Sequence, residues 1–192
     1  MTKHKKQELV AGLDIGSGRI TCLIGAPDTA TGSVKVLGGA SVVCRGVKGG
    51  VVINILEAAA ASTRAVEEAE ALVGSTVSSV WLGVRGSHLQ SFNNRGAFNI
   101  ARTDREITAA DVDSVVASAK AIPLSPDREI LHVVPQGFAL DRQRGVPHPV
   151  GMEASLLEVD VHIITASSAH LNNIMKAVGQ AGFQVVEPVY GL

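Results

Sequence analysis

Near the start of the chain, two short apolar runs flank the sequence Leu13-Asp14-Ile15-Gly16-Ser17-Gly18-Arg19. The runs are residues 9–13 and 20–25, and both are rich in residues that favour β-strands. The two glycines between them tolerate the positive φ angles of a tight turn. The pattern therefore predicts a β-hairpin whose first strand ends in an acidic residue, Asp14.

Two interpretations of this turn follow from its residue types. In the first, backbone N–H groups and the Ser17 hydroxyl bind a phosphate, while Asp14 holds a Mg²⁺ ion through water. In the second, Gly16 and Gly18 only relax the backbone of a hairpin, and Asp14 bonds to that backbone. The residue types alone favour the second, structural interpretation.

The residues beyond the turn predict a β-meander followed by a crossover. Strands are expected at 34–37 and 40–44. The next segment has an apolar period of about 3.6 and predicts an amphipathic helix, with Asn54 as its N-cap and Gly74 as its stop. A strand over 77–84 follows, and this strand, helix, strand order predicts a crossover onto the same sheet.

Residues 87–157 differ in pattern from their surroundings and predict an inserted β-α-β subdomain. Thr108 and Asp111 form the two ends of a capping box that begins its helix. A strand over 130–140 follows, in which Pro135 favours a sheet edge or a bulge. Turns or loops are expected within the insertion at residues 92–98 and 144–149.

The chain is therefore expected to divide into residues 9–86, the inserted residues 87–157, and residues 158–192. The apolar strand 159–165 and the helix after it resume the earlier α/β pattern, which assigns them to the first unit. The sequence stops soon after Glu187-Pro188 without a polar tail. We expect it to be a fragment of a longer protein.

Composition excludes several classes of protein. The chain has 192 residues, 46% of them hydrophobic and 18% charged, which fits a compact globular protein. Its 17 basic and 18 acidic side chains create no overall field for nucleic acid, so no nucleic-acid partner is expected. No apolar run reaches the roughly 18 residues of a membrane span, and no secretory signal is present, so a cytoplasmic location is expected.

Other candidate sites in the sequence favour structural roles. The glycine clusters 38–39 and 46–50 do not match a P-loop or a Rossmann motif and are interpreted as flexible connections. The six histidines lack metal-ligand spacing, and no G-x-S-x-G motif is present. Cys22 and Cys44 are expected to be small buried hydrophobes. The N-terminal lysines are too few for a lipid-binding cluster and predict a solvated terminus; they are Lys3, Lys5 and Lys6.

Several segments, taken in their order and spacing, resemble FtsA, the bacterial actin-like cell-division family. They are residues 12–18 (GLDIGSG), 45–54 (RGVKGGVVIN), 64–70 (RAVEEAE), 127–133 (DREILHV), 135–136, 149–152 and 161–166. The resemblance runs from about Leu9 to the last residue. It implies an actin/Hsp70-like ATPase fold of the α/β class, in which subdomain 1A, a mixed sheet with helices, is interrupted by the small β-α-β subdomain 1C.

The resemblance also implies a nucleotide site for ATP and Mg²⁺. The implied cofactor-binding residues are Asp14, Gly16, Ser17, Gly18 and Arg19. Asp14 would face Mg²⁺ through water, and the amides of Ser17 and Gly18 would face the β- and γ-phosphates. Glu187 resembles the catalytic acid that in this superfamily lies near the attacking water.

The function implied is that of a scaffold, with slow ATP hydrolysis at most. Such a protein tethers FtsZ filaments to the inner face of the cytoplasmic membrane at the division site and recruits other division proteins. Subdomain 1C would contact those proteins and self-associate into filaments. FtsZ binding and the membrane-binding C-terminal helix would belong to the half of the family sequence that lies beyond these residues. With half of the nucleotide site, the chain is expected to bind ATP weakly or not at all.

Two alternatives share parts of this pattern. A sugar-kinase-like phosphotransferase also has an Asp-x-Gly loop, but it needs a positioned base for a hydroxyl substrate. An actin-like platform protein of pilus or secretion assembly is the second alternative. The segment at residues 45–54 favours the division scaffold over both.

Overall fold

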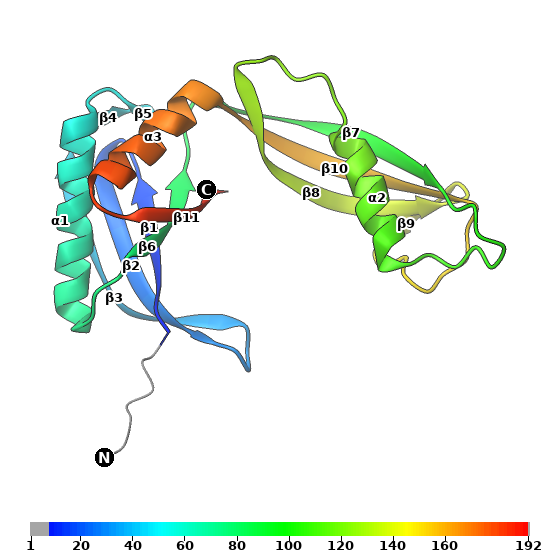
Figure 1. The fold of residues 1–192 in the computed structure, drawn as a ribbon, viewed down its shortest axis with the longest axis horizontal. Helices are drawn as coiled ribbons and strands as arrows, with labels where there is room; N and C mark the ends of the chain where they lie inside the picture. The colour runs from blue at the N-terminus through cyan, green and yellow to red at the C-terminus, as the bar shows by residue number, and fades with distance from the viewer. Residues whose placement is uncertain (1–7, 192) are drawn as a thin grey trace. The chain divides into compact units, whose positions relative to one another are not determined.

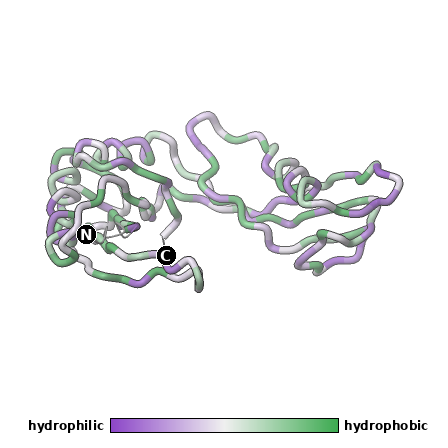
Figure 2. Tube along the Cα trace, turned by 60° about the horizontal axis from the view of Figure 1, so that its bottom comes forward, coloured by the Kyte–Doolittle hydropathy of each residue, from purple (hydrophilic) through white to green (hydrophobic). Residues whose placement is uncertain are grey.

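A computed structural model describes residues 8–191, which divide into two compact units. Unit 1 comprises the described residues up to Leu89 and those from Ser167 onward, and unit 2 comprises Gln90–Ala166. The lysines of the N-terminal tail lie outside the described residues. Hydrophobic segments occur in both units (Figure 2), and each unit buries its own apolar residues.

Unit 1 is built on a five-stranded mixed sheet with the strand order β11-β6-β1-β2-β3 (Figure 1). Its elements are β1 (Val10–Ile15), β2 (Gly18–Asp28), β3 (Ser33–Cys44), the short β4 (Val47–Lys48) and β5 (Val51–Val52), α1 (Ile55–Val73), β6 (Ser79–Val84), α3 (Ser168–Gln180) and β11 (Gln184–Tyr190). Strands β1, β2 and β3 are antiparallel neighbours, whereas β6 runs parallel to both β1 and β11.

The predicted hairpin and crossover are confirmed. Strands β1 and β2 pair from Val10 opposite Gly25 to Ile15 opposite Ile20. The turn between them is closed by the Gly16 N–H, which donates to the carbonyl of Arg19 at 3.0 Å. Alternate residues along both strands are buried, as expected for a sheet with one covered face.

The predicted helix is α1, and both of its ends are confirmed. The Asn54 side chain accepts from the Glu57 N–H at 3.1 Å, and Gly74 adopts the left-handed conformation after the last turn. The Glu57 carboxylate accepts from the Arg45 N–H at 2.9 Å. It therefore ties the N-terminus of α1 to the end of β3.

The interpretation of Gly38 and Gly39 as a flexible break is wrong, because β3 is one continuous strand through them. A Cβ atom on Gly38 would lie 2.8 Å from Cγ2 of Val73, and one on Gly39 would lie 2.9 Å from the Cys22 carbonyl. Both glycines allow β3 to pack closely against its neighbours. Propensity alone does not reveal this requirement.

Unit 2 is a four-stranded sheet with the order β7-β10-β8-β9 and a helix across it (Figure 1). Its elements are β7 (Leu89–Asn99), α2 (Ala109–Lys120), β8 (Arg128–Leu140), β9 (Gln143–Val146) and β10 (Leu156–Ser167). Strand β9 pairs with β8 only from Phe138 to Leu140. Pro135 therefore lies in the part of β8 that β9 does not reach, which agrees with its predicted place at an edge.

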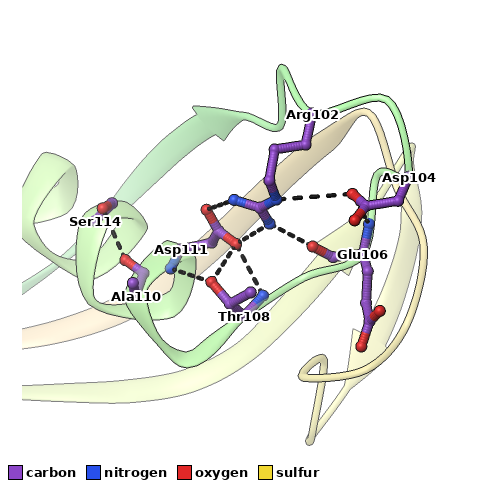
Figure 3. Close-up of polar contacts among 7 residues, drawn as sticks. All are labelled: Arg102, Asp104, Glu106, Thr108, Ala110, Asp111 and Ser114. Atoms are coloured by element: carbon purple, nitrogen blue, oxygen red, sulfur yellow. Dashed lines mark hydrogen bonds and ion pairs between the residues drawn. The ribbon is translucent and has the colours of Figure 1, made fainter.

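The capping box of α2 is confirmed and is part of a larger polar network (Figure 3). The carboxylate of Asp111 accepts from the backbone N–H and the hydroxyl of Thr108, at 2.8 and 2.6 Å. It also accepts from both Nη atoms of Arg102, at 3.2 and 2.5 Å. These hydrogen bonds, first from Arg102 and then from Thr108, hold the pKa of Asp111 well below its usual range.

Three predictions in the insertion and just after it are wrong. Residues 92–98 form no turn but lie inside β7, and residues 144–146 of the loop predicted at 144–149 belong to β9. The strand 159–165 belongs to β10, which lies between β7 and β8 and does not join the sheet of unit 1. The inserted unit accordingly ends at Ala166, whereas the sequence predicted its end at residue 157.

Candidate functional site

The candidate site lies at the edge of the unit 1 sheet where three parallel strands end. Asp14 is near the end of β1 and is in register with Gly83 of β6, which is in register with Val189 of β11. Because β1, β6 and β11 are parallel, their carboxyl ends meet at this edge. Ligands of open α/β sheets bind at such an edge.

An open depression of about 570 Å³ lies beside this edge. Its lining residues come from the β1–β2 turn, the β4–β5 turn and the segment after β6. They are Ser17, Gly49, Gly50, Arg85, Gly86 and Ser87. Two hydroxyl groups, one guanidinium and glycine-rich backbone therefore line the space, and this set suits an anionic ligand.

Two glycines shape the depression by bringing backbone against backbone. A Cβ atom on Gly50 would lie 2.0 Å from the Arg85 carbonyl oxygen, and one on Gly86 would lie 2.5 Å from the Gly49 carbonyl oxygen. Both residues also have positive φ angles, of 76° and 134°. The interpretation of residues 46–50 as a flexible connection is therefore wrong, since the turn packs closely against the chain after β6.

Asp14 is paired with a residue that the sequence interpretation did not include. Nη2 of Arg85 donates to Oδ2 of Asp14, and the two side chains are 47% and 35% exposed. A Cβ atom on Gly16 would lie 2.8 Å from the same Nη2, so the glycine leaves room for the guanidinium. The predicted acid and the first turn glycine therefore meet at Arg85.

Of the other predicted residues in the turn, one lines the depression and one is paired with a different strand. Ser17 lines the depression, whereas Gly18 begins β2 with a φ of 90°. The guanidinium of Arg19 donates to the hydroxyl and the carbonyl of Ser41, at 3.0 and 3.2 Å, on the side of β3. The structure therefore brings Ser17 close to the depression but pairs Arg19 with another strand.

Glu187 is exposed on β11 and does not line the depression. It is in register with Trp81, which is in register with Gly12. Glu187 thus lies two strands away from β1. It is level with Gly12, which precedes Asp14 by two residues and lies on the same face of the sheet. The structure does not bring the two carboxylates together.

The residues present fit a magnesium–nucleotide site only if the nucleotide supplies part of the coordination. Within residues 8–191, no group of three or more His, Cys, Asp or Glu could hold a metal ion. Mg²⁺ commonly uses one or two carboxylates and completes its octahedron with phosphate oxygens and water. Asp14 provides one such carboxylate, and the glycine-shaped depression beside it provides room for phosphates.

Arg85 and the Gly49-Gly50 turn are the parts of the site that sequence reasoning missed. A usable signal was present for Arg85. Once a crossover makes β1 and β6 parallel neighbours, the residue after β6 must share an edge with the acid that ends β1. No comparable signal marks the turn, because its glycines contact a backbone far away in the sequence.

Comparison with known proteins defines the class of this fold. Residues 86–165 match the family described as the SHS2 domain inserted in FtsA. A chain of the PilM–PilN type IV pilus biogenesis complex superposes with a TM-score of 0.62 at 12% sequence identity, over 96% of this chain and 48% of that chain. The protein therefore has the predicted actin-like ATPase fold, and its insertion matches an SHS2 domain.

Three curated relatives are all of one kind. The chain is 39% identical to the cell division protein FtsA of Borreliella burgdorferi over 188 residues, and 35% identical to that of Pseudomonas aeruginosa over 185 residues. It is 33% identical to FtsA of Escherichia coli K12 over 192 residues. These matches cover 96–99% of the chain but only 44–45% of the relatives. The chain is therefore similar to FtsA over nearly its whole length, and it spans less than half the length of these relatives.

Proposed function

We propose that this chain is part of a cell-division protein that binds ATP with Mg²⁺ and acts as an actin-like scaffold. The observation that carries the proposal is the edge where Asp14 ends β1 beside a glycine-shaped depression. That edge occurs in a chain whose matched relatives are cell division proteins named FtsA.

Each residue of the edge has a chemical role in this proposal. Asp14 holds Mg²⁺ through water, while the Ser17 and Gly18 amides face the phosphates. Gly16 leaves room for the Arg85 guanidinium beside Asp14, and its N–H closes the hairpin onto Arg19. Arg19 near the phosphates and Glu187 near the attacking water rest on the family resemblance alone, because neither lines the depression.

The nucleotide would act as a clamp between this part of the protein and the part that lies beyond it. The matched relatives are more than twice as long as the aligned region, and the depression beside Asp14 is open to solvent. One side of a clamp supplies only some of the charge-assisted hydrogen bonds to phosphate. The 192 residues alone should therefore bind ATP much more weakly than the complete protein.

The proposed partners follow from the similarity to FtsA. They are FtsZ filaments, other division proteins that contact unit 2, and further copies of the protein in a filament. None of the helices within residues 8–191 combines the length and apolarity needed to span a bilayer. We assign membrane attachment, at the inner face of the cytoplasmic membrane at the division site, to a C-terminal helix outside these residues.

Calorimetric titration of the complete gene product with Mg-ATP tests the nucleotide site. Asp14→Ala should weaken binding by about tenfold or more, which is the scale of one charge-assisted interaction. Asp160→Ala is the matched control, because Asp160 forms a similar exposed pair with Arg95 in unit 2. Failure of the wild-type protein to bind ATP, or equal affinities for wild type and Asp14→Ala, would overturn the proposal.

An actin-like platform of pilus assembly shares this fold, as the superposition shows. At 12% identity, however, that likeness concerns the fold alone, whereas the matches to FtsA reach 39%. Co-sedimentation of the complete protein with FtsZ filaments separates the two functions. Binding to FtsZ is expected, and its absence would favour the pilus-type role.

A further inference from the structure

The cation that faces Asp14 in the structure is the guanidinium of Arg85. Nη2 donates directly to Oδ2 of the carboxylate, at the place where the proposed function requires a hydrated Mg²⁺. Both side chains reach solvent, at 47% and 35% exposure. An ion pair so exposed contributes little stability, so either side chain can exchange its partner at small cost.

The backbone and the side chain of Arg85 differ in their freedom. Its carbonyl oxygen packs against Gly50 so closely that a Cβ atom there would lie 2.0 Å away, and Gly86 follows with a φ of 134°. The backbone is therefore fixed by close packing. The side chain, in contrast, lines the open depression. A turn of the guanidinium away from Asp14 would keep it beside any phosphate bound there.

We propose that Arg85 is a phosphate-binding residue whose guanidinium is paired with Asp14 when no nucleotide is bound. When Mg-nucleotide binds, Asp14 would hold the hydrated Mg²⁺ in place of Arg85, and the guanidinium would turn to a phosphate oxygen. A planar guanidinium forms strong, often bidentate hydrogen bonds to phosphate. The inference rests on the proposed function and adds a second ligand-binding residue and an internal competitor for the metal.

This exchange makes the effect of Asp14 depend on magnesium. With Mg²⁺ present, the carboxylate binds the hydrated metal and supports the nucleotide. Without Mg²⁺, the carboxylate retains Arg85 and repels the phosphates. Asp14→Asn should therefore weaken ATP binding in Mg²⁺ but strengthen it in a chelator, whereas Arg85→Gln should weaken it in both. A purely structural role of the pair would give losses of the same sign in both buffers.

The test is calorimetric titration of ATP into the complete gene product, in Mg²⁺ and in EDTA. Arg85→Gln should weaken binding on the order of 10- to 100-fold, and Arg85→Lys should restore part of the loss. Arg95→Gln is the matched control, since Arg95 forms an exposed pair with Asp160 in unit 2; it should leave affinity unchanged. Circular dichroism checks that each variant is folded.

The outcomes separate this inference from the proposed function. If wild type binds ATP and Arg85→Gln binds it equally well, the inference is overturned while the nucleotide site stands. If Asp14→Asn weakens binding equally in Mg²⁺ and in EDTA, the exchange is also overturned. No ATP binding by wild type in either buffer would overturn both proposals together.

Discussion

The hydroxyl of Ser17 accepts a hydrogen bond from the backbone N–H of Gly50 at 3.0 Å, across 33 positions in the sequence. This bond joins the β1–β2 turn to the β4–β5 turn. Gly50 in turn packs against the backbone of Arg85 after β6. Three chain segments around the depression are therefore held together by the fold itself, and such preorganisation lowers the cost of ordering them on ligand binding.

Replacement of Gly50 should disrupt this junction strongly. In Gly50→Ala, the new methyl group would lie 2.0 Å from the Arg85 carbonyl oxygen, at a residue whose φ is 76°. We expect a loss of about 3 kcal/mol or more in the free energy of unfolding, because neither backbone can move without breaking other contacts. Urea denaturation measures the change.

Gly49→Ala is the matched control for that variant. Gly49 also has a positive φ, of 59°, but a Cβ atom there would meet nothing within 4 Å. Its loss should be only the conformational cost of about 1–2 kcal/mol. Equal losses of unfolding free energy in the two variants would show that close packing at Gly50 does not contribute to stability.

Removal of the Ser17 hydroxyl should release the Gly50 amide. Ser17→Ala deletes the acceptor of this hydrogen bond, which should cost about 1 kcal/mol and speed hydrogen exchange at the Gly50 N–H. Ser87→Ala removes a hydroxyl from the same depression without touching the bond, and it should leave that exchange rate unchanged. Unchanged protection of Gly50 in Ser17→Ala would contradict the expectation.

Features fixed by neighbouring residues could be predicted from the sequence. The β1–β2 hairpin and both ends of α1 depend on turn glycines and on caps within a few positions of each other. Strand β10 shows the limit of such reasoning. Its alternating apolar residues identify a strand, but alternation does not say which sheet a strand joins, and β10 pairs with β7 and β8.

The candidate site was predictable to a similar extent. Asp14 and Ser17 stand in a recognisable motif and do lie at the carboxyl edge of the sheet. Arg85 stands in no motif, and its position beside Asp14 follows only from the parallel pairing of β1 with β6. The tight turn at Gly50 could not be predicted, since its requirement for glycine comes from a backbone contact with residue 85.

Acid should destabilise unit 2 through Asp111 (Figure 3). The pKa of this carboxyl is lower in the folded chain than in the unfolded chain, because Arg102 and Thr108 donate to it. Its contribution to stability is therefore complete above the unfolded pKa, near 3.9, and is lost as pH falls below about 4. Asp111→Asn should lower the melting temperature at pH 7 and reduce the further loss on going to pH 3.

Asp104→Asn provides the control for this pH dependence. Asp104 lies 3.7 Å from Nε of Arg102, but its side chain is 66% exposed. Thermal unfolding of this variant at pH 7 and pH 3 should follow the wild type. If Asp111→Asn retains the full acid sensitivity of the wild type, the other carboxyls of unit 2 with lowered pKa values, Asp127, Asp141 and Asp160, would have to account for it.

Helix α2 packs directly on β7 at Gly96. A side chain at this residue should push the helix away from the strand. A Cβ atom on Gly96 would lie 2.5 Å from the Val115 carbonyl oxygen and 2.7 Å from the Ala119 N atom. Gly96→Ala should therefore cost about 1–3 kcal/mol by overpacking, as measured by urea denaturation. Gly137→Ala on β8 would meet nothing within 4 Å and should change stability by only about 0.5 kcal/mol. Since the α2 backbone cannot approach β7 past a methyl group, equal stabilities of these two variants would mean that the contact between helix and strand is looser than the structure shows.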